Sequence, residues 1–143
     1  MWTLCGVALA SPFFNDEELE YVCEAEQVLA NKGLDVYSPM RHEDRDEKRT
    51  AAWSVKTFMK DVEAINKADA VVMLYHGNYS DSGTAWECGF AYALNKPVIV
   101  VHLGGPSNLM VHEGSRANVN GIEGLRFYDF SEMPELSHSG EMI

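Results

Sequence analysis

Paired cysteines, positive charge and long apolar runs are all scarce in this sequence. Cys5, Cys23 and Cys88 show no CxxC or CxxH spacing, so neither a disulfide framework nor a zinc site is indicated, and a reducing compartment fits best. Eleven Lys and Arg stand against 22 Asp and Glu, and the formal net charge of −11 would repel nucleic-acid phosphates and anionic membranes. No apolar run approaches the roughly 18–20 residues that span a bilayer.

Cofactor and targeting motifs are also missing. Neither GxGxxG nor a P-loop occurs, which argues against dinucleotides and nucleoside triphosphates. The five histidines are scattered, so we predict no metal site and no nucleophilic His pair. The first residues lack the basic segment of a signal peptide. We therefore expect a cytoplasmic protein without a cofactor, with neither nucleic acid nor membrane as a partner.

The chain has the size and composition of one folded domain. Its 143 residues are 46% hydrophobic and 23% charged, and they contain no repeat or linker. We expect a single domain over residues 1–143, with 131–143 as a frayed end.

Short apolar runs alternate with segments of helical spacing along the chain. The expected strands are 3–10, 34–37, 70–75, 98–101 and 125–128, and the expected helices are 16–31, 53–68 and 83–94. This alternation predicts an α/β fold with a five-stranded, doubly wound parallel sheet flanked by helices, of flavodoxin-like or Rossmann-like type. Ligands are expected in the crevice beyond the carboxyl ends of the strands.

The densest polar segment runs from Asp81 to Glu87, where a loop is expected to enter a helix. Both carboxylates can face the crevice, and a Glu87 in the first helical turn would be held ionised, as a nucleophile must be. The alternative is structural, because Thr84-x-x-Glu87 also matches a capping box in which Glu87 returns to the Thr84 N–H.

Asp61 interrupts an apolar stripe of the helix expected at 53–68, since positions 58, 61, 62 and 65 lie on one face. A carboxylate buried there without a partner would have a raised pKa, which suits a general acid. The alternative is that Asp61 reaches solvent at the margin of the stripe.

Three further loops follow expected strands. Asn108-Leu109-Met110 could touch the crevice or a neighbouring subunit, or form an ordinary loop. Ser11 to Asn15 offers free N–H groups and two aromatic rings, although Phe13 and Phe14 are more often core residues. The third loop carries Glu43, and the charged segment 41–49 around it is either a solvated loop or helix extension or a mobile lid.

Together these segments resemble the nucleoside deoxyribosyltransferase family. The matching segments, over about residues 3–128, are 8–14, Asp61, 68–70, 81–89, 96–98 and 108–110. The D-x-G-T-A-x-E-x-G pattern at 81–89 is the most specific of them. The resemblance implies an enzyme that cleaves the N-glycosidic bond of a deoxynucleoside and transfers the deoxyribosyl group to another free base.

The resemblance also implies a role for each matching residue. Glu87 corresponds to the nucleophile, which forms a covalent deoxyribosyl-enzyme that the incoming base resolves with net retention. Asp61 and Asp81 correspond to acidic residues near the base and the sugar, and Glu43 to a polar side chain that faces the base. Asn108, with Met110 beside it, corresponds to a residue that holds the 5′-hydroxyl in a neighbouring subunit's site, which implies a homo-oligomer. The remaining substrate-binding positions are Ala10, Ser11, Phe13 and Gly83.

The chain departs from the family pattern in its first strand. Some members place there a tyrosine that orients the nucleophile, whereas this chain has Ala8 at or next to that position. The orienting group is then expected elsewhere, with Tyr75, Tyr79 and Tyr128 as candidates.

Two other functions compete with base exchange. The related deoxynucleoside monophosphate N-glycosidases typically carry serine where this chain has Asp81 and Asn108, and a carboxylate would repel a phosphate. A non-catalytic flavodoxin-like nucleoside-binding module is the second, since fold alone does not determine function. Such a module would not need Asp61, Asp81, Glu87 and Asn108 together.

Overall fold

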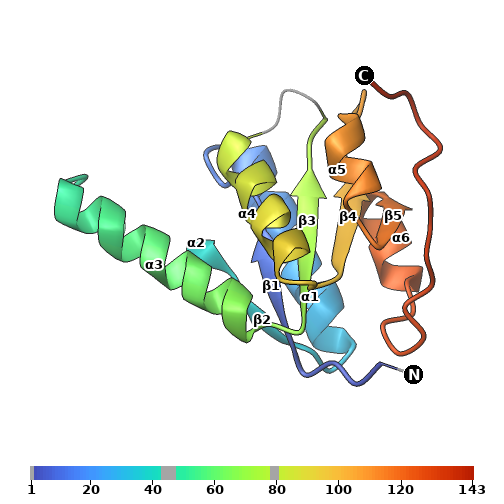
Figure 1. Cartoon of the computed structure of the whole chain (residues 1–143), viewed down its shortest axis with the longest axis horizontal. Coiled ribbons are helices and arrows are strands. Elements are labelled where there is room, and N and C mark those ends of the chain that lie inside the picture. Colours follow the sequence, from blue (N-terminus) through green and yellow to red (C-terminus); the bar gives the residue numbers. More distant parts are fainter. Residues whose placement is uncertain (1, 43–47, 78–80) are drawn as a thin grey trace.

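The computed structural model describes residues 2–42, 48–77 and 81–143. In chain order its elements are β1 (Gly6–Ala10), α1 (Asp16–Asn31), β2 (Asp35–Tyr37), α2 (Pro39–His42), α3 (Ala51–Lys67), β3 (Ala70–Tyr75), α4 (Ser82–Ala93), β4 (Val98–His102), α5 (Leu109–Glu113), β5 (Ala117–Asn120) and α6 (Gly121–Phe127). The five strands form one parallel sheet in the order β2-β1-β3-β4-β5, with helices on both faces (Figure 1), so the predicted fold class is confirmed. Among the described residues, no helix is long and apolar enough to cross a membrane.

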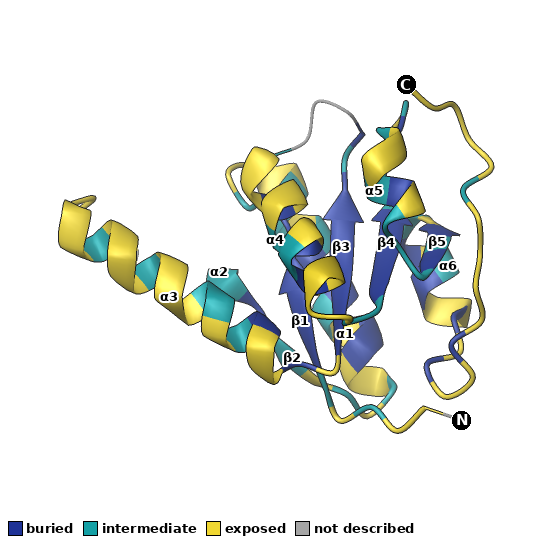
Figure 2. Ribbon diagram, viewed as in Figure 1, coloured by how far each residue is buried: buried dark blue, intermediate teal, exposed yellow. Residues whose placement is uncertain are grey.

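The side chains of the strands alternate between two core clusters. The larger cluster lies between the sheet and helices α1 and α6, and the smaller one lies between the sheet and helices α3 and α4, with Val111 of α5 at its edge. All six residues of β3 are buried, as expected for a strand covered on both faces (Figure 2). The sheet is thus a rigid base for the loops at its carboxyl edge.

Helix α3 packs on the sheet through its last turns only. The N-terminal half of α3 extends away from the sheet (Figure 1), and Ile65 is the helix's one buried residue. Val55, Phe58 and Met59 of the predicted apolar stripe are 64%, 50% and 55% exposed. The stripe therefore forms an open surface over most of its length.

The position of the fifth strand differs from the prediction. Residues 125–128 were expected to form it, but the strand is β5, and the segment after it is helix α6. Ala117 and Val119 point into the core while Asn118 and Asn120 alternate with them, and two asparagines in four residues resemble a turn. Ile122 and Leu125 then bury one face of α6.

The expectation of a frayed end at 131–143 is wrong. Met133 is fully buried, and residue 136 forms a β-bridge with Ala117. Further on, the Ser107 N–H donates to Glu141 O and the Ile143 N–H donates to Ser107 O, both at 2.8 Å. The last residues are therefore hydrogen-bonded beside α5.

Candidate active site

Asp81 caps the N-terminus of α4. Its Oδ2 accepts hydrogen bonds from the Thr84 N–H and the Thr84 hydroxyl, both at 3.1 Å. A Cβ at Gly83 would lie 3.0 Å from this oxygen, which explains the glycine. The capping-box alternative is wrong, because Asp81 and not Glu87 occupies the Thr84 N–H. The sequence analysis expected Glu87 in the first turn of α4, but it lies in the second turn.

Glu87 lines a hollow of about 430 Å³ between α3 and α4, here called the Glu87 hollow. Its lining residues are Phe58, Asp61, Val62, Ser82, Gly83, Trp86 and Glu87. Burial, followed by the charges of Asp61 and Asp81, raises the pKa of Glu87 to about 8. The expectation that the helix start would hold Glu87 ionised is therefore wrong, since burial and two nearby carboxylates outweigh any favourable helix dipole.

Asp61 is half-buried and has a specific partner. The Tyr37 hydroxyl donates to Asp61 Oδ1 at 3.2 Å, so Asp61 does not simply reach solvent at the edge of its helix. Asp61 also lines a small recess with Phe13, Tyr37 and His42. Asp61 thus lines two hollows, one shared with Phe13 and the other shared with Glu87.

Aromatic rings flank the Glu87 hollow. The ring centroids of Phe58 and Trp86 are 5.4 Å apart, and Trp86 stacks on Phe90 at 5.4 Å with an interplanar angle of 20°. Phe58 and Trp86 are each 50% exposed. Such a surface can stack on a flat, apolar-faced ligand. The sequence analysis did not single out these two residues, although Trp86 lies next to Glu87 in the 81–89 pattern.

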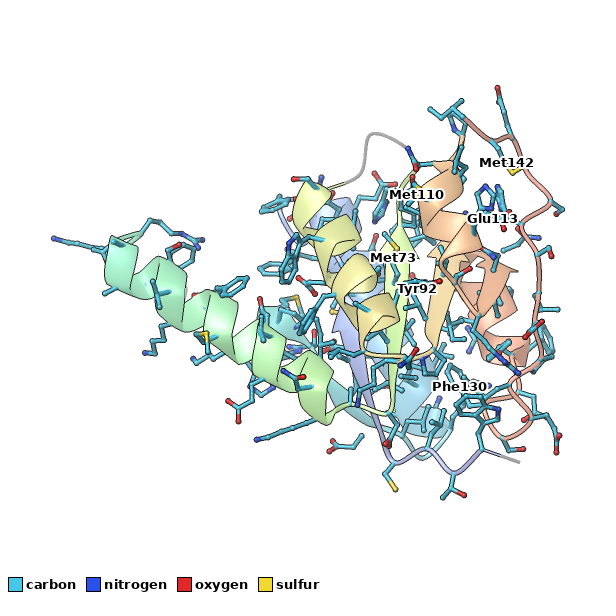
Figure 3. The ribbon with its side chains drawn as sticks, viewed as in Figure 1. Met73, Tyr92, Met110, Glu113, Phe130 and Met142 are labelled. Carbon is cyan, nitrogen blue, oxygen red and sulfur yellow. The ribbon has the colours of Figure 1, made fainter. Side chains whose placement is uncertain are left out.

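A second hollow, of about 590 Å³, lies between α4 and α5 and is here called the Asn108 hollow. It is lined by Asp81, Asn108 and Met110 together with Tyr75 and Tyr92, and Figure 3 labels Met110 on α5 and Tyr92 on α4. Asn108 caps α5 by accepting the Met110 N–H at 2.9 Å, and its own N–H donates to the Tyr75 hydroxyl at 3.1 Å. Within one chain, Asn108 and Met110 therefore line one hollow, and Asp61 and Glu87 line another.

The other predicted residues are placed less directly. Ala10 and Ser11 lie at the carboxyl end of β1 but are buried, and neither lines the two hollows. Glu43 and Tyr79 lie outside the described residues, as does most of the charged segment 41–49. Across the described ranges, no group of three or more His, Cys, Asp or Glu side chains is placed to hold a metal ion.

The tyrosines near the sheet have distinct partners. The Tyr128 hydroxyl donates to Pro134 O, and Tyr128 belongs to the core under α1 and α6, so it does not orient Glu87. The Tyr75 hydroxyl accepts the Asn108 N–H. Tyr37, which the sequence analysis missed, is the tyrosine bonded to Asp61. No spacing along the chain signals this contact, because 24 positions separate the two residues.

Comparison with known proteins gives consistent matches. The nucleoside 2-deoxyribosyltransferase family model matches residues 7–120. A nucleoside deoxyribosyltransferase from Limosilactobacillus fermentum is 27% identical over 106 residues, and the match covers 66% of this chain and 63% of that protein. The chain thus spans less than two thirds of this relative's length.

Solved structures add closer and more distant matches. The 2-deoxyribosyltransferase of the psychrotolerant bacterium Bacillus psychrosaccharolyticus shares 36% identity with a TM-score of 0.86, covering 94% of this chain and 99% of that one. The CMP N-glycosidase of Clostridium botulinum shares 19% identity with a TM-score of 0.57, covering 85% and 94% of the two chains, and supports the fold alone.

Proposed function

The chain belongs to the nucleoside 2-deoxyribosyltransferase family, and from this premise we propose that it exchanges the nucleobase of 2′-deoxyribonucleosides through a covalent deoxyribosyl–Glu87 intermediate. The observation that carries the proposal is the Glu87 hollow, in which a half-buried carboxylate lies beside a second carboxylate, Asp61, and exposed aromatic rings. The rings suit a flat base, and a carboxylate can attack an anomeric carbon.

The proposed reaction has two displacement steps. A Glu87 carboxylate oxygen bonds to C1′ of the sugar while the C1′–N bond breaks, and the departing base takes up a proton. A second base then attacks C1′, the bond to Glu87 breaks, and the incoming nitrogen loses its proton. Asp61 is the proposed acid–base group, because it lines both the Glu87 hollow and the recess that contains Phe13.

The protonation state of Glu87 constrains the first step. With a pKa of about 8, most Glu87 carries a proton at neutral pH, and only the ionised form is a nucleophile. The rate of adduct formation at subsaturating substrate is therefore expected to rise with pH, to reach about half of its maximum near pH 8 and to level off above that pH.

Charge disfavours the nucleotide-hydrolase alternative. Asp61, Asp81 and Glu87 are close enough for the two aspartates to act on the pKa of Glu87, and negative charge on such a cluster would repel a phosphate. A neutral 5′-hydroxyl can instead donate a hydrogen bond to a carboxylate. Neutral deoxynucleosides are therefore the proposed substrates.

An exchange assay separates the alternatives. The protein is incubated with free adenine and either deoxyinosine or, in a second reaction, thymidine, and the products are separated by chromatography. Deoxyadenosine with hypoxanthine is the outcome expected from deoxyinosine. Free deoxyribose without deoxyadenosine would identify a hydrolase, and unchanged deoxyinosine and thymidine would contradict a catalytic function.

A homo-oligomer with shared sites is the proposed working form. Asn108 and the 75% exposed Met110 do not line the Glu87 hollow of their own chain, which fits a role at a neighbour's site. Inactive Glu87→Ala and Asn108→Ala variants, mixed and allowed to exchange subunits, should recover part of the activity, because some sites then hold both native residues. No recovery despite demonstrated exchange would place Asn108 in its own chain's site or outside any site.

A further inference from the structure

Tyr37 occupies an unusual place between the sheet and the site. It is the last residue of β2, and in the parallel pairing with β1 it lies opposite Ala8. Ala8 belongs to the core cluster under α3 and α4, and paired residues of neighbouring strands project to the same face of a sheet. The small side chain of Ala8 is thus next to a long one that ends in a hydroxyl.

The Tyr37 hydroxyl donates its hydrogen bond to the Asp61 carboxylate. It donates to Asp61 Oδ1 at 3.2 Å, and this hydrogen bond joins the edge strand β2 to helix α3. The Tyr37 ring stacks on His42 with centroids 4.4 Å apart and an interplanar angle of 4°. The phenol is therefore held at both its ring and its oxygen.

We propose that Tyr37 is a positioning residue of the transfer reaction, whose hydroxyl holds the Asp61 carboxylate next to Glu87 and the substrate base. This inference rests on the proposed function. A carboxylate on a helix side chain can rotate, and a hydrogen bond to one oxygen limits that rotation. Asp61 lies on α3 one turn before Ile65, the helix's one buried residue, and the hydrogen bond from Tyr37 ties its carboxylate to strand β2.

The electrostatic environment of Tyr37 agrees with this arrangement. Burial, then the charge of Asp61 and the hydrogen bond to it, and then the charge of Glu87 raise the pKa of Tyr37 well above its usual range. Both carboxylates thus act on the same phenol. Removing Asp61 should therefore make Tyr37 easier to ionise.

A double-mutant cycle tests the proposal in the exchange assay. Tyr37→Phe removes the donor and keeps the ring, and we expect a roughly 10- to 100-fold loss of kcat, typical of a hydrogen bond to a charged group. Because Tyr37 acts through Asp61, the double variant Tyr37→Phe/Asp61→Asn should be no slower than Asp61→Asn alone. Wild-type kcat in Tyr37→Phe, or losses that multiply in the double variant, would overturn the proposal.

Tyr128→Phe is the matched control. It also removes a tyrosine hydroxyl that donates one hydrogen bond, at 2.9 Å to Pro134 O, but on the opposite face of the sheet. Its kcat should stay within about twofold of wild type. An equal loss in Tyr37→Phe and Tyr128→Phe would mean a general structural effect and would contradict positioning.

A spectroscopic measurement does not depend on turnover. The phenolate absorbance of Tyr37 is the signal of a protein minus the signal of the same protein with Tyr37→Phe. It should appear at lower pH when measured in the Asp61→Asn variant than when measured in the wild type. No shift would contradict the Tyr37–Asp61 pair itself. If the Tyr37–Asp61 pair is confirmed but the wild type exchanges no base, the proposed function fails and the positioning role fails with it. If the wild type is active and Tyr37→Phe has the same kcat, only the positioning role is rejected.

Discussion

Alanines make up a larger share of the core cluster on one face of the sheet than on the other. Under α1 and α6, long apolar residues such as Leu9, Leu29 and Leu125 are at most 1% exposed and close the core. Under α3 and α4, the cluster contains the small residues Ala8 and Ala10, together with Ala68 and Ala91. Two hollows lie beside α4, and much of α3 is exposed, as Figure 2 shows.

The contrast separates stability from function. The first face holds the larger of the two core clusters, and burial of apolar surface is the main favourable contribution to folding. The second face holds Glu87 within electrostatic reach of two further carboxylates, Asp61 and Asp81, an arrangement that costs stability. Substitutions on the two faces should therefore have opposite signatures.

The largest effect is expected from Asp61→Asn on the second face. Loss of the proposed acid–base group should lower kcat of base exchange by roughly 10²–10⁴-fold while the melting temperature changes little. The measurement is steady-state kinetics beside thermal unfolding. Glu63→Gln is the control, because Glu63 is an exposed residue two positions along the same helix and should keep near-normal kcat. Normal kcat in Asp61→Asn would contradict the claim that the face under α3 and α4 carries the catalytic groups.

Leu29→Ala tests the first face. Leu29 is fully buried on α1, and its truncation should lower the free energy of unfolding by about 2–5 kcal/mol, measured by urea denaturation. The kcat per folded molecule should be unchanged. Val55→Ala, at a 64% exposed position of α3, should cost at most about 0.5 kcal/mol. A kcat loss in folded Leu29→Ala would show that the two faces are coupled.

A smaller, pH-dependent effect is expected from Glu87→Gln. The folded-state pKa of Glu87, about 8, lies above its ordinary value of 4.5, so the wild-type protein takes up a proton on folding between these values. The contribution of the Glu87 carboxyl to the free energy of unfolding is fully present below about pH 4.5 and is lost as the pH rises through about 8. Glutamine cannot ionise, so the variant should become relatively more stable, by roughly 2–4 kcal/mol at about pH 9.

Denaturation of both proteins at several pH values measures this difference. The exposed Glu63→Gln variant should show no comparable gain at high pH. A constant difference between wild type and Glu87→Gln across this pH range would contradict the raised pKa of Glu87.

Local patterns along the chain predicted the first four strands, the three long helices, and the neighbourhood of Asp61 and Glu87. They failed where contacts distant in sequence decide the structure. Asn118 and Asn120 made the segment look like a turn, but β5 forms there, and Ala117 and Val119 are buried where it pairs with β4. The assignment of the α4 cap failed because Asp81 and Thr84 are both good N-cap residues three positions apart. Tyr37 was missed since only folding brings β2 beside α3.

Trapping the intermediate tests the central claim most directly. The protein is mixed with deoxyinosine without an acceptor base, quenched with acid, digested and examined by mass spectrometry, with Glu87→Gln treated in parallel. We expect a mass gain of one deoxyribosyl group on the peptide that contains Glu87, located to that residue by fragmentation and missing from the variant. An adduct on another residue, or base exchange by Glu87→Gln at the wild-type rate, would contradict the account.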